Sequence, residues 1–216
     1  MQAVVFDCDG TLADSHHVIV EAMTRAFEQS NLPPPDDAAV RRVIGLSLPI
    51  AIAHLAQDIA PDYHATLVDA YKTSFHDMRS SGAVHEALYP GVRACLLGLQ
   101  NLGVALGIAT GKSKRGLAHL LNTHDLRGFF GSLQTADDNP SKPNPHMLEA
   151  AMLELGATPQ DTVMVGDSPY DIEMALAAGT RAIGVAWSDH GAQALIAAGA
   201  HGMLAGYDDW SVLLKS

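Results

Sequence analysis

Short apolar runs alternate along the chain with longer segments in which apolar residues recur at helical spacing. The runs are rich in valine, isoleucine and alanine and stop at glycine or a polar residue, as buried strands do. Four runs are clear and a fifth is weaker: 3–6, 104–109, 162–165 and 181–185, then 132–135. The helical segments between them stop at Gly103, Gly156 and Gly179. This order predicts an α/β fold, a Rossmann-like three-layer core whose mainly parallel sheet has helices on both faces.

One segment interrupts the alternation. Residues 14 to about 82 contain no convincing strand, and apolar residues from Ile19 to Phe27 share one helical face until the prolines at 33–35. Helical patterns then resume up to Ser80. The sequence therefore predicts an all-helical insert at 14–85 within a catalytic core formed by residues 1–13 and 86–216.

Composition narrows the possible partners. The 216 residues carry 13 Lys and Arg against 24 Asp and Glu, a formal charge of −11, which disfavours binding to nucleic acid or anionic lipid. Two cysteines are too few for a disulfide framework. No apolar run approaches the roughly 20 residues that cross a bilayer, and no basic leader precedes the first strand. We expect a cytoplasmic protein, monomeric or homodimeric, that acts on a small molecule.

The first predicted strand ends in a pair of carboxylates. Asp7 and Asp9 are two residues apart, so both side chains can project to one side of an extended chain, where they repel unless a cation is present. Gly10 permits a sharp turn, and Thr11 adds a hydroxyl or backbone donor. Taken alone, the motif is equally well explained as a solvated strand end or a helix cap.

Two further segments offer phosphate ligands. Thr110 and Gly111 end the next strand, although a threonine there is more often a helix cap, and the basic residues that follow (Lys112, Lys114, Arg115) are expected to be solvated. Lys142 precedes the proline-rich 143–145 loop, which restricts its backbone. A surface lysine beside a turn is the simpler reading of that segment in isolation.

A second acidic pair follows the strand at 162–165. Asp167 ends the strand and Asp171 lies one helical turn later, so their carboxylates can face the same point. Helix capping explains part of this pattern. Because the carboxyl ends of parallel strands share one edge, four carboxylates, one hydroxyl and one lysine are expected to meet there.

That set of groups suits Mg²⁺ and a phosphoryl group. Mg²⁺ prefers oxygen ligands, and one Mg²⁺ with one lysine reduces the charge of four aspartates from −4 to −1. Crowding should raise the proton affinity of one carboxyl, which could then serve as an acid.

Together the four motifs resemble those of the haloacid dehalogenase-like phosphohydrolases, in particular the phosphoglycolate phosphatase-like branch with a helical cap. The resemblance covers nearly the whole chain. It rests on Asp7-x-Asp9-Gly10-Thr11, on Thr110, on Lys142 with the Pro-x-Pro that follows, and on Gly166-Asp167-Ser168-x-x-Asp171.

The resemblance implies a phosphoaspartyl mechanism. Asp7 would be the nucleophile, Asp9 the acid and base, Thr110 the phosphate-holding hydroxyl, and Lys142 the neutralising cation. Mg²⁺ would be held by Asp7, the backbone carbonyl of Asp9 and Asp167, with Asp171 in support. The remaining substrate contacts would come from Gly10, Thr11 and Gly111, and the insert would act as a lid.

Substrate identity stays open. Many relatives have asparagine where this chain has Gly111, which offers only a backbone donor. Arg42, in the 41–47 segment, is a candidate ligand for a carboxylate or second phosphate. Small phosphomonoesters are the expected substrates, and a pyrophosphatase or sugar phosphomutase is the alternative. A phosphoaccepting signalling domain and an inactive binding protein are the non-enzymatic alternatives.

Overall fold

The computed structural model describes residues 2–214. Its main sheet has six strands, and each neighbouring pair is parallel. In spatial order the strands are β5 (Ser132–Thr135), β4 (Ala105–Thr110), β1 (Ala3–Phe6), β6 (Thr162–Gly166), β7 (Arg181–Val185) and β8 (Gly202–Leu204). The predicted α/β fold is confirmed. Strand β8 is not apparent from the sequence, because three residues at a sheet edge leave almost no periodic signal.

Strand register places the predicted motifs at one edge. Phe6 lies opposite Ile108 of β4 and Val165 of β6. Two residues further along each strand, Thr110 and Asp167 lie level with Cys8. Cys8 is the residue between Asp7 and Asp9. The carboxyl ends of the three central strands therefore gather segments that are more than 150 residues apart in sequence.

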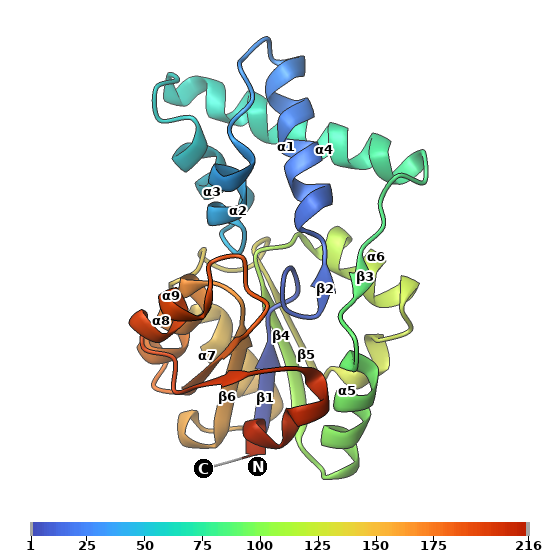
Figure 1. Ribbon diagram of the computed structural model, residues 1–216, viewed down its shortest axis with the longest axis vertical. Helices are drawn as coiled ribbons and strands as arrows, with labels where there is room; N and C mark the ends of the chain where they lie inside the picture. Colours follow the sequence, from blue (N-terminus) through green and yellow to red (C-terminus); the bar gives the residue numbers. More distant parts are fainter. Residues whose placement is uncertain (1, 215–216) are drawn as a thin grey trace.

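Helices cover both faces of the sheet (Figure 1). Alternate β1 residues point to opposite sides: Val4 and Phe6 join one buried cluster, and Ala3 and Val5 join the other. The first cluster includes residues of α5 (Val92–Asn101), α6 (Lys114–Thr123) and η4 (Tyr207–Leu214). The second includes residues of α7 (His146–Leu155), α8 (Pro169–Ala177) and α9 (Ala192–Ala197). Two short turns, η2 (Arg127–Phe129) and η3 (Pro159–Asp161), complete the core.

A group of helices lies beyond the carboxyl edge of the sheet, at the top of Figure 1. It comprises α1 (His16–Gln29), α2 (Asp37–Val43), α3 (Leu48–Leu55), η1 (Pro61–Tyr63) and α4 (His64–Ser80). Met23, Phe27, Ile52 and Leu67 form a separate buried cluster in this group. The predicted helical content is present, and the boundaries 14–85 stay a prediction.

Two short strands join this group to the core. Ala13 and Asp14 form β2, which pairs antiparallel with β3 (Ala87–Leu88). Neither strand was predicted, since two residues have no recognisable period. The pairing brings both connections of the insert side by side. None of the helices in residues 2–214 is long and apolar enough to cross a membrane.

Candidate active site

The predicted catalytic side chains are buried where the central strands end. Asp7 follows β1, and its backbone N–H donates to the Val165 carbonyl at 2.9 Å. The side chains in question have at most 7% of their residue surface exposed: Asp7, Asp9, Thr110, Lys142, Asp167 and Asp171. Burying so many charges is unfavourable unless they pair with one another or with a ligand.

Three of the carboxylates form one cluster. Asp7, Asp167 and Asp171 each place an oxygen within 4.8 Å of the other two. Lys142 Nζ lies 2.9 Å from Asp7 Oδ1 and 2.6 Å from Asp171 Oδ1. The cluster thus brings three acidic groups to one buried lysine, as the sequence pattern anticipated.

Asp7 is the member of the cluster whose carboxylate lacks hydrogen bonds to the other described residues. Both of its carboxylate oxygens are buried without a hydrogen-bond partner among residues 2–214, although Lys142 pairs with one of them ionically. Burial raises the pKa of Asp7 to about 8; Lys142 opposes this shift, and the charges of Asp171 and Asp167 add to it. Burial also raises the pKa of Asp167. Orphaned buried carboxylate oxygens of this kind fit a divalent cation, which would stabilise their ionised forms.

Asp171 performs two structural tasks within the cluster. Its Oδ2 accepts the Ser168 backbone N–H at 3.0 Å and the Ser168 hydroxyl at 2.7 Å, which caps α8. Its Oδ1 accepts from Lys142. Asp171 therefore positions the lysine beside Asp7.

Asp9 lies in a different environment. Its Oδ1 accepts a hydrogen bond from the Ser15 hydroxyl and lies 2.7 Å from Lys112 Nζ. The same Nζ lies 2.7 Å from Glu86 Oε1. The expectation that Lys112 is solvated is wrong: its side chain is 8% exposed, because the two carboxylates hold it against the cavity floor. Ser15 and Glu86 carried no signal in the sequence, since a hydrophobic pattern cannot show which polar residue faces Asp9.

Gly10 and Thr11 lie beside Asp167 rather than in the cavity. The Thr11 hydroxyl donates to Asp167 Oδ1 at 3.1 Å. Gly10 has φ +75°, and a Cβ there would lie 2.2 Å from Asp167 Oδ2. Neither residue lines the cavity, and both contact or closely approach Asp167; their substrate contacts stay a prediction.

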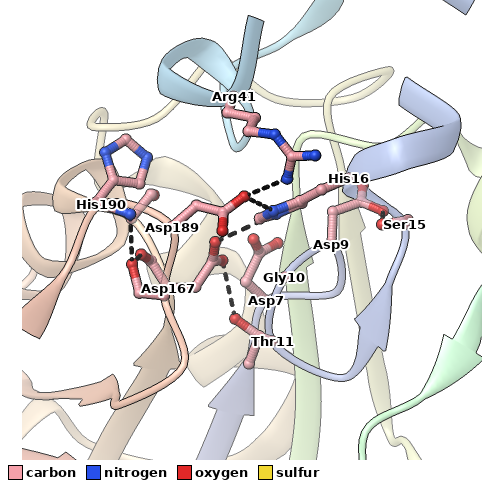
Figure 2. Close-up of polar contacts among 12 residues, drawn as sticks. Asp7, Asp9, Gly10, Thr11, Ser15, His16, Arg41, Asp167, Asp189 and His190 are labelled. Carbon is pink, nitrogen blue, oxygen red and sulfur yellow. Dashed lines mark hydrogen bonds and ion pairs between the residues drawn. The ribbon is translucent and has the colours of Figure 1, made fainter. Parts of the chain in front are cut away.

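A chain of charged groups links the insert to Asp167 (Figure 2). Arg41 Nη1 donates to Asp189 Oδ2 at 2.5 Å, and His16 Nδ1 lies 2.8 Å from the same oxygen. His16 Nε2 is 3.5 Å from Asp167 Oδ2. Burial lowers the pKa of His16, but Asp167 and Asp189 more than offset it, raising the pKa to about 9. His16 is buried, because these two acids hold it in the interior.

A cavity of about 740 Å³ separates the sheet edge from the insert. Asp7, Asp9 and Thr110 line its floor. The insert approaches the core closely at Gly111. A Cβ added to this glycine would lie only 2.6 Å from the Leu46 carbonyl oxygen. Arg42 is exposed and does not line the cavity. The structure therefore gives its predicted substrate contact no support: its helix points Arg41, and not Arg42, at the core.

Comparison with known proteins agrees with this arrangement. A family model described as haloacid dehalogenase-like hydrolase matches residues 4–185. The chain belongs to this family. The motif resemblance seen in the sequence is confirmed.

Relatives of this haloacid dehalogenase-like hydrolase are phosphatases. A protein of Dickeya dadantii named probable phosphatase IndB is 36% identical over 201 residues, which cover 90% of this chain and 85% of the relative. Pyrophosphatase PpaX of Bacillus pumilus is 32% identical (90% and 88% covered). A phosphoglycolate phosphatase of Pseudomonas putida is also 32% identical (87% and 71% covered). This haloacid dehalogenase-like hydrolase is accordingly a phosphatase.

The fold also matches a solved structure. The crystal structure of a hydrolase from Pseudomonas syringae superposes with a TM-score of 0.84 over 99% of this chain and 98% of the other, at 22% identity. That likeness supports the α/β fold of this haloacid dehalogenase-like hydrolase over the part that superposes.

Proposed function

We propose that this phosphatase hydrolyses small phosphomonoesters by transferring the phosphoryl group to Asp7, with Mg²⁺ as its cofactor. The observation that carries the proposal is the state of Asp7. Its two oxygens are buried without hydrogen bonds among the described residues, and the residue lines the cavity beside Asp9 and Thr110. A carboxylate that is not engaged in hydrogen bonds is available to attack phosphorus.

In the first step an Asp7 oxygen forms a bond to phosphorus while the bond to the leaving oxygen breaks. Asp9 gives its proton to that oxygen. Ser15 and Lys112 both contact Asp9 Oδ1. The proton that Asp9 donates is therefore carried by its other oxygen, Oδ2. In the second step Asp9 takes a proton from water, whose oxygen attacks phosphorus and releases Asp7 and phosphate.

Thr110 and Lys142 stabilise the transferred group. The Thr110 Oγ1 accepts the Lys112 backbone N–H at 3.3 Å, which leaves the hydroxyl proton to donate to a phosphoryl oxygen. Lys142, fixed by Asp171, supplies positive charge next to Asp7.

Asp7, Asp167 and the backbone carbonyl of Asp9 would hold Mg²⁺, with Asp171 close by. When bound, the ion neutralises charge on the aspartates and on the phosphoryl oxygens. Without that charge, a carboxylate nucleophile and a phosphate dianion repel each other. The helical insert would act as a lid that excludes water during transfer.

Phosphoglycolate is the first substrate to test, because one relative is a phosphoglycolate phosphatase. Pyrophosphate is the second candidate, because an equally similar relative is a pyrophosphatase. Steady release of inorganic phosphate without an isomerised product would decide against a sugar phosphomutase.

The phosphoaspartyl step is tested by trapping. Wild-type protein mixed with ³²P-labelled substrate and Mg²⁺ and then quenched in acid should retain label that hydroxylamine removes. Asp7→Asn should retain none and should lose at least about 1,000-fold in turnover, with an unchanged circular dichroism spectrum. Label that persists in Asp7→Asn would show that another residue is the acceptor. Chelation should stop turnover, and added Mg²⁺ should restore it.

A further inference from the structure

Positive side chains are concentrated around the cavity of this acidic protein. The chain carries 13 Lys and Arg and a net charge of −11. Four of the 13 line the cavity above Asp7: Lys72, Arg79, Lys112 and Arg115. The acidic residues lining it are Asp7, Asp9 and Asp137. Since Asp9 is paired with Lys112 and Asp7 with Lys142, the remaining cations need another explanation.

Arg79, near the end of α4 in the insert, has no anionic partner. Within residues 2–214 its guanidinium forms no hydrogen bond or ion pair, and its Nε is buried and unpaired. Its Cζ lies 5.1 Å from the centroid of the Phe75 ring, which supports the guanidinium plane from one side. A buried Nε–H without an acceptor is costly unless a ligand accepts its hydrogen bond.

Arg115 approaches the same region from the core, at the start of α6. Its Nη2 donates to His76 Nδ1 at 3.1 Å. Because arginine can only donate, this nitrogen of His76 carries no proton and its Nε2–H is a donor. A helix of the insert and a helix of the core therefore both present donors to the cavity.

No acid in the described chain neutralises the two arginines. Burial lowers the pKa of Arg79, the charge of Glu86 opposes this, and the charge of Arg115 adds to it. Glu86 is bound to Lys112, and Asp137 accepts the Lys114 backbone N–H at 2.8 Å. Lys72 lies 3.8 Å from Asp69 at an exposed site. Arg79 and Arg115 thus repel each other, and an anion between them would remove the repulsion.

We propose that Arg79 and Arg115, assisted by His76, bind a second anionic group on the substrate, carried by the part that leaves. This inference rests on the proposed function, since the same cavity must hold the phosphoryl group over Asp7. It defines the substrate class as phosphomonoesters whose alcohol bears a carboxylate or another phosphate. Both groups present two oxygens to a guanidinium. The subsite spans insert and core, so the substrate itself joins the two.

Two matched substrate pairs test the charge requirement. 2-Phosphoglycolate is compared with 2-hydroxyethyl phosphate, which replaces the carboxylate by a neutral hydroxymethyl group. 1,3-Propanediol bisphosphate is compared with propyl phosphate. Wild-type kcat/KM should favour the anionic member of at least one pair by about 10- to 100-fold, the range for hydrogen bonds to a charged group. Preference in the first pair identifies a carboxylate ligand, and preference in the second a phosphate.

Arg79→Met and Arg115→Met should each remove about 10- to 100-fold of kcat/KM for the favoured anionic substrate, mainly through KM. In both variants kcat/KM for the neutral member of the pair should stay within about 3-fold of the wild-type value. Lys114→Met is the control, because Lys114 is a cation beside Arg115 that pairs with Asp138 and does not line the cavity. Arg115 is exposed, so its variant remains informative if Arg79→Met fails to fold.

Equal wild-type activity on both members of both pairs would overturn the inference, as would equal losses on anionic and neutral substrates in the arginine variants. Neither result would contradict the phosphoaspartyl proposal, because that proposal is tested by whether Asp7 retains the ³²P label. Failure to hydrolyse any anionic member would overturn the inference together with the proposed substrate class.

Discussion

Lys112 Nζ lies 2.7 Å from Asp9 Oδ1 and 2.7 Å from Glu86 Oε1. One buried ammonium thus joins the proposed acid and base to a residue immediately before β3, on the connection that returns from the insert. The pairing raises the pKa of Lys112, because the two carboxylates outweigh the effect of burial. The lysine therefore stays charged at neutral pH.

The first prediction concerns this contact. Lys112→Met should lower the free energy of unfolding by about 3 to 5 kcal/mol, because Glu86 and Asp9 would be left buried without their counter-ion. The double variant Lys112→Met/Glu86→Gln should recover much of that loss, since one unpaired charge is removed. Urea unfolding measures both. Lys114→Met, which breaks an exposed pair with Asp138, should show no measurable change. A double variant less stable than Lys112→Met would contradict the assignment of Lys112 as the counter-ion of Glu86.

The second prediction concerns pH and metal. In metal-free protein the pKa of Asp7 is about 8, well above its ordinary value of 3.8, so the folded state binds this proton more tightly than the unfolded state does. The contribution of Asp7 to stability therefore falls as pH rises from about 4 to about 8. Asp7→Asn cannot ionise and should lose less stability over the same range. Mg²⁺ should restore wild-type stability at pH 8, because it favours the carboxylate.

Thermal melts of both proteins between pH 5 and 8, with chelator and then with Mg²⁺, measure this difference. The melting temperature of the chelated wild type should decline relative to that of Asp7→Asn. Parallel curves would mean that Asp7 is already ionised in the folded protein.

The third prediction compares two glycines with the same backbone angle. Gly10 has φ +75° and Gly82 has φ +76°, but a Cβ at Gly10 would collide with Asp167, whereas one at Gly82 has nothing within 4 Å. Gly82→Ala should cost about 1 kcal/mol of stability from backbone strain alone. Gly10→Ala should cost about 2 to 4 kcal/mol and should also weaken Mg²⁺ activation, because Asp167 must move. Equal stability and equal metal dependence in the two variants would show that Gly10 is not needed to place Asp167.

The fold and the acidic cluster could be predicted because their signals are local. Each motif sits at the end of an apolar run, and parallel strands bring such ends to one edge. Asp7, Lys142, Asp167 and Asp171 meet in the structure as that reasoning expects. The roles assigned to them remain predictions.

The contacts that could not be predicted depend on side-chain direction across long separations. Lys112 and Arg115 belong to a polar stretch that resembles a solvated helix start, and only the folded insert shows what lies opposite them. His16 sits among eleven histidines, and its burial depends on Asp189, which is 173 residues away. The strands β2, β3 and β8 are too short for any periodicity to be recognised.

The antiparallel pairing of Ala13 with Leu88 and of Asp14 with Ala87 has a consequence for how such proteins diversify. The polypeptide leaves the core and returns to it at neighbouring positions, through a pairing that lies outside the six-stranded sheet. Any module whose own termini lie a strand's width apart could be grafted at this point. The hydrolytic core and the share of substrate selection that we propose for the insert can therefore change separately within one gene.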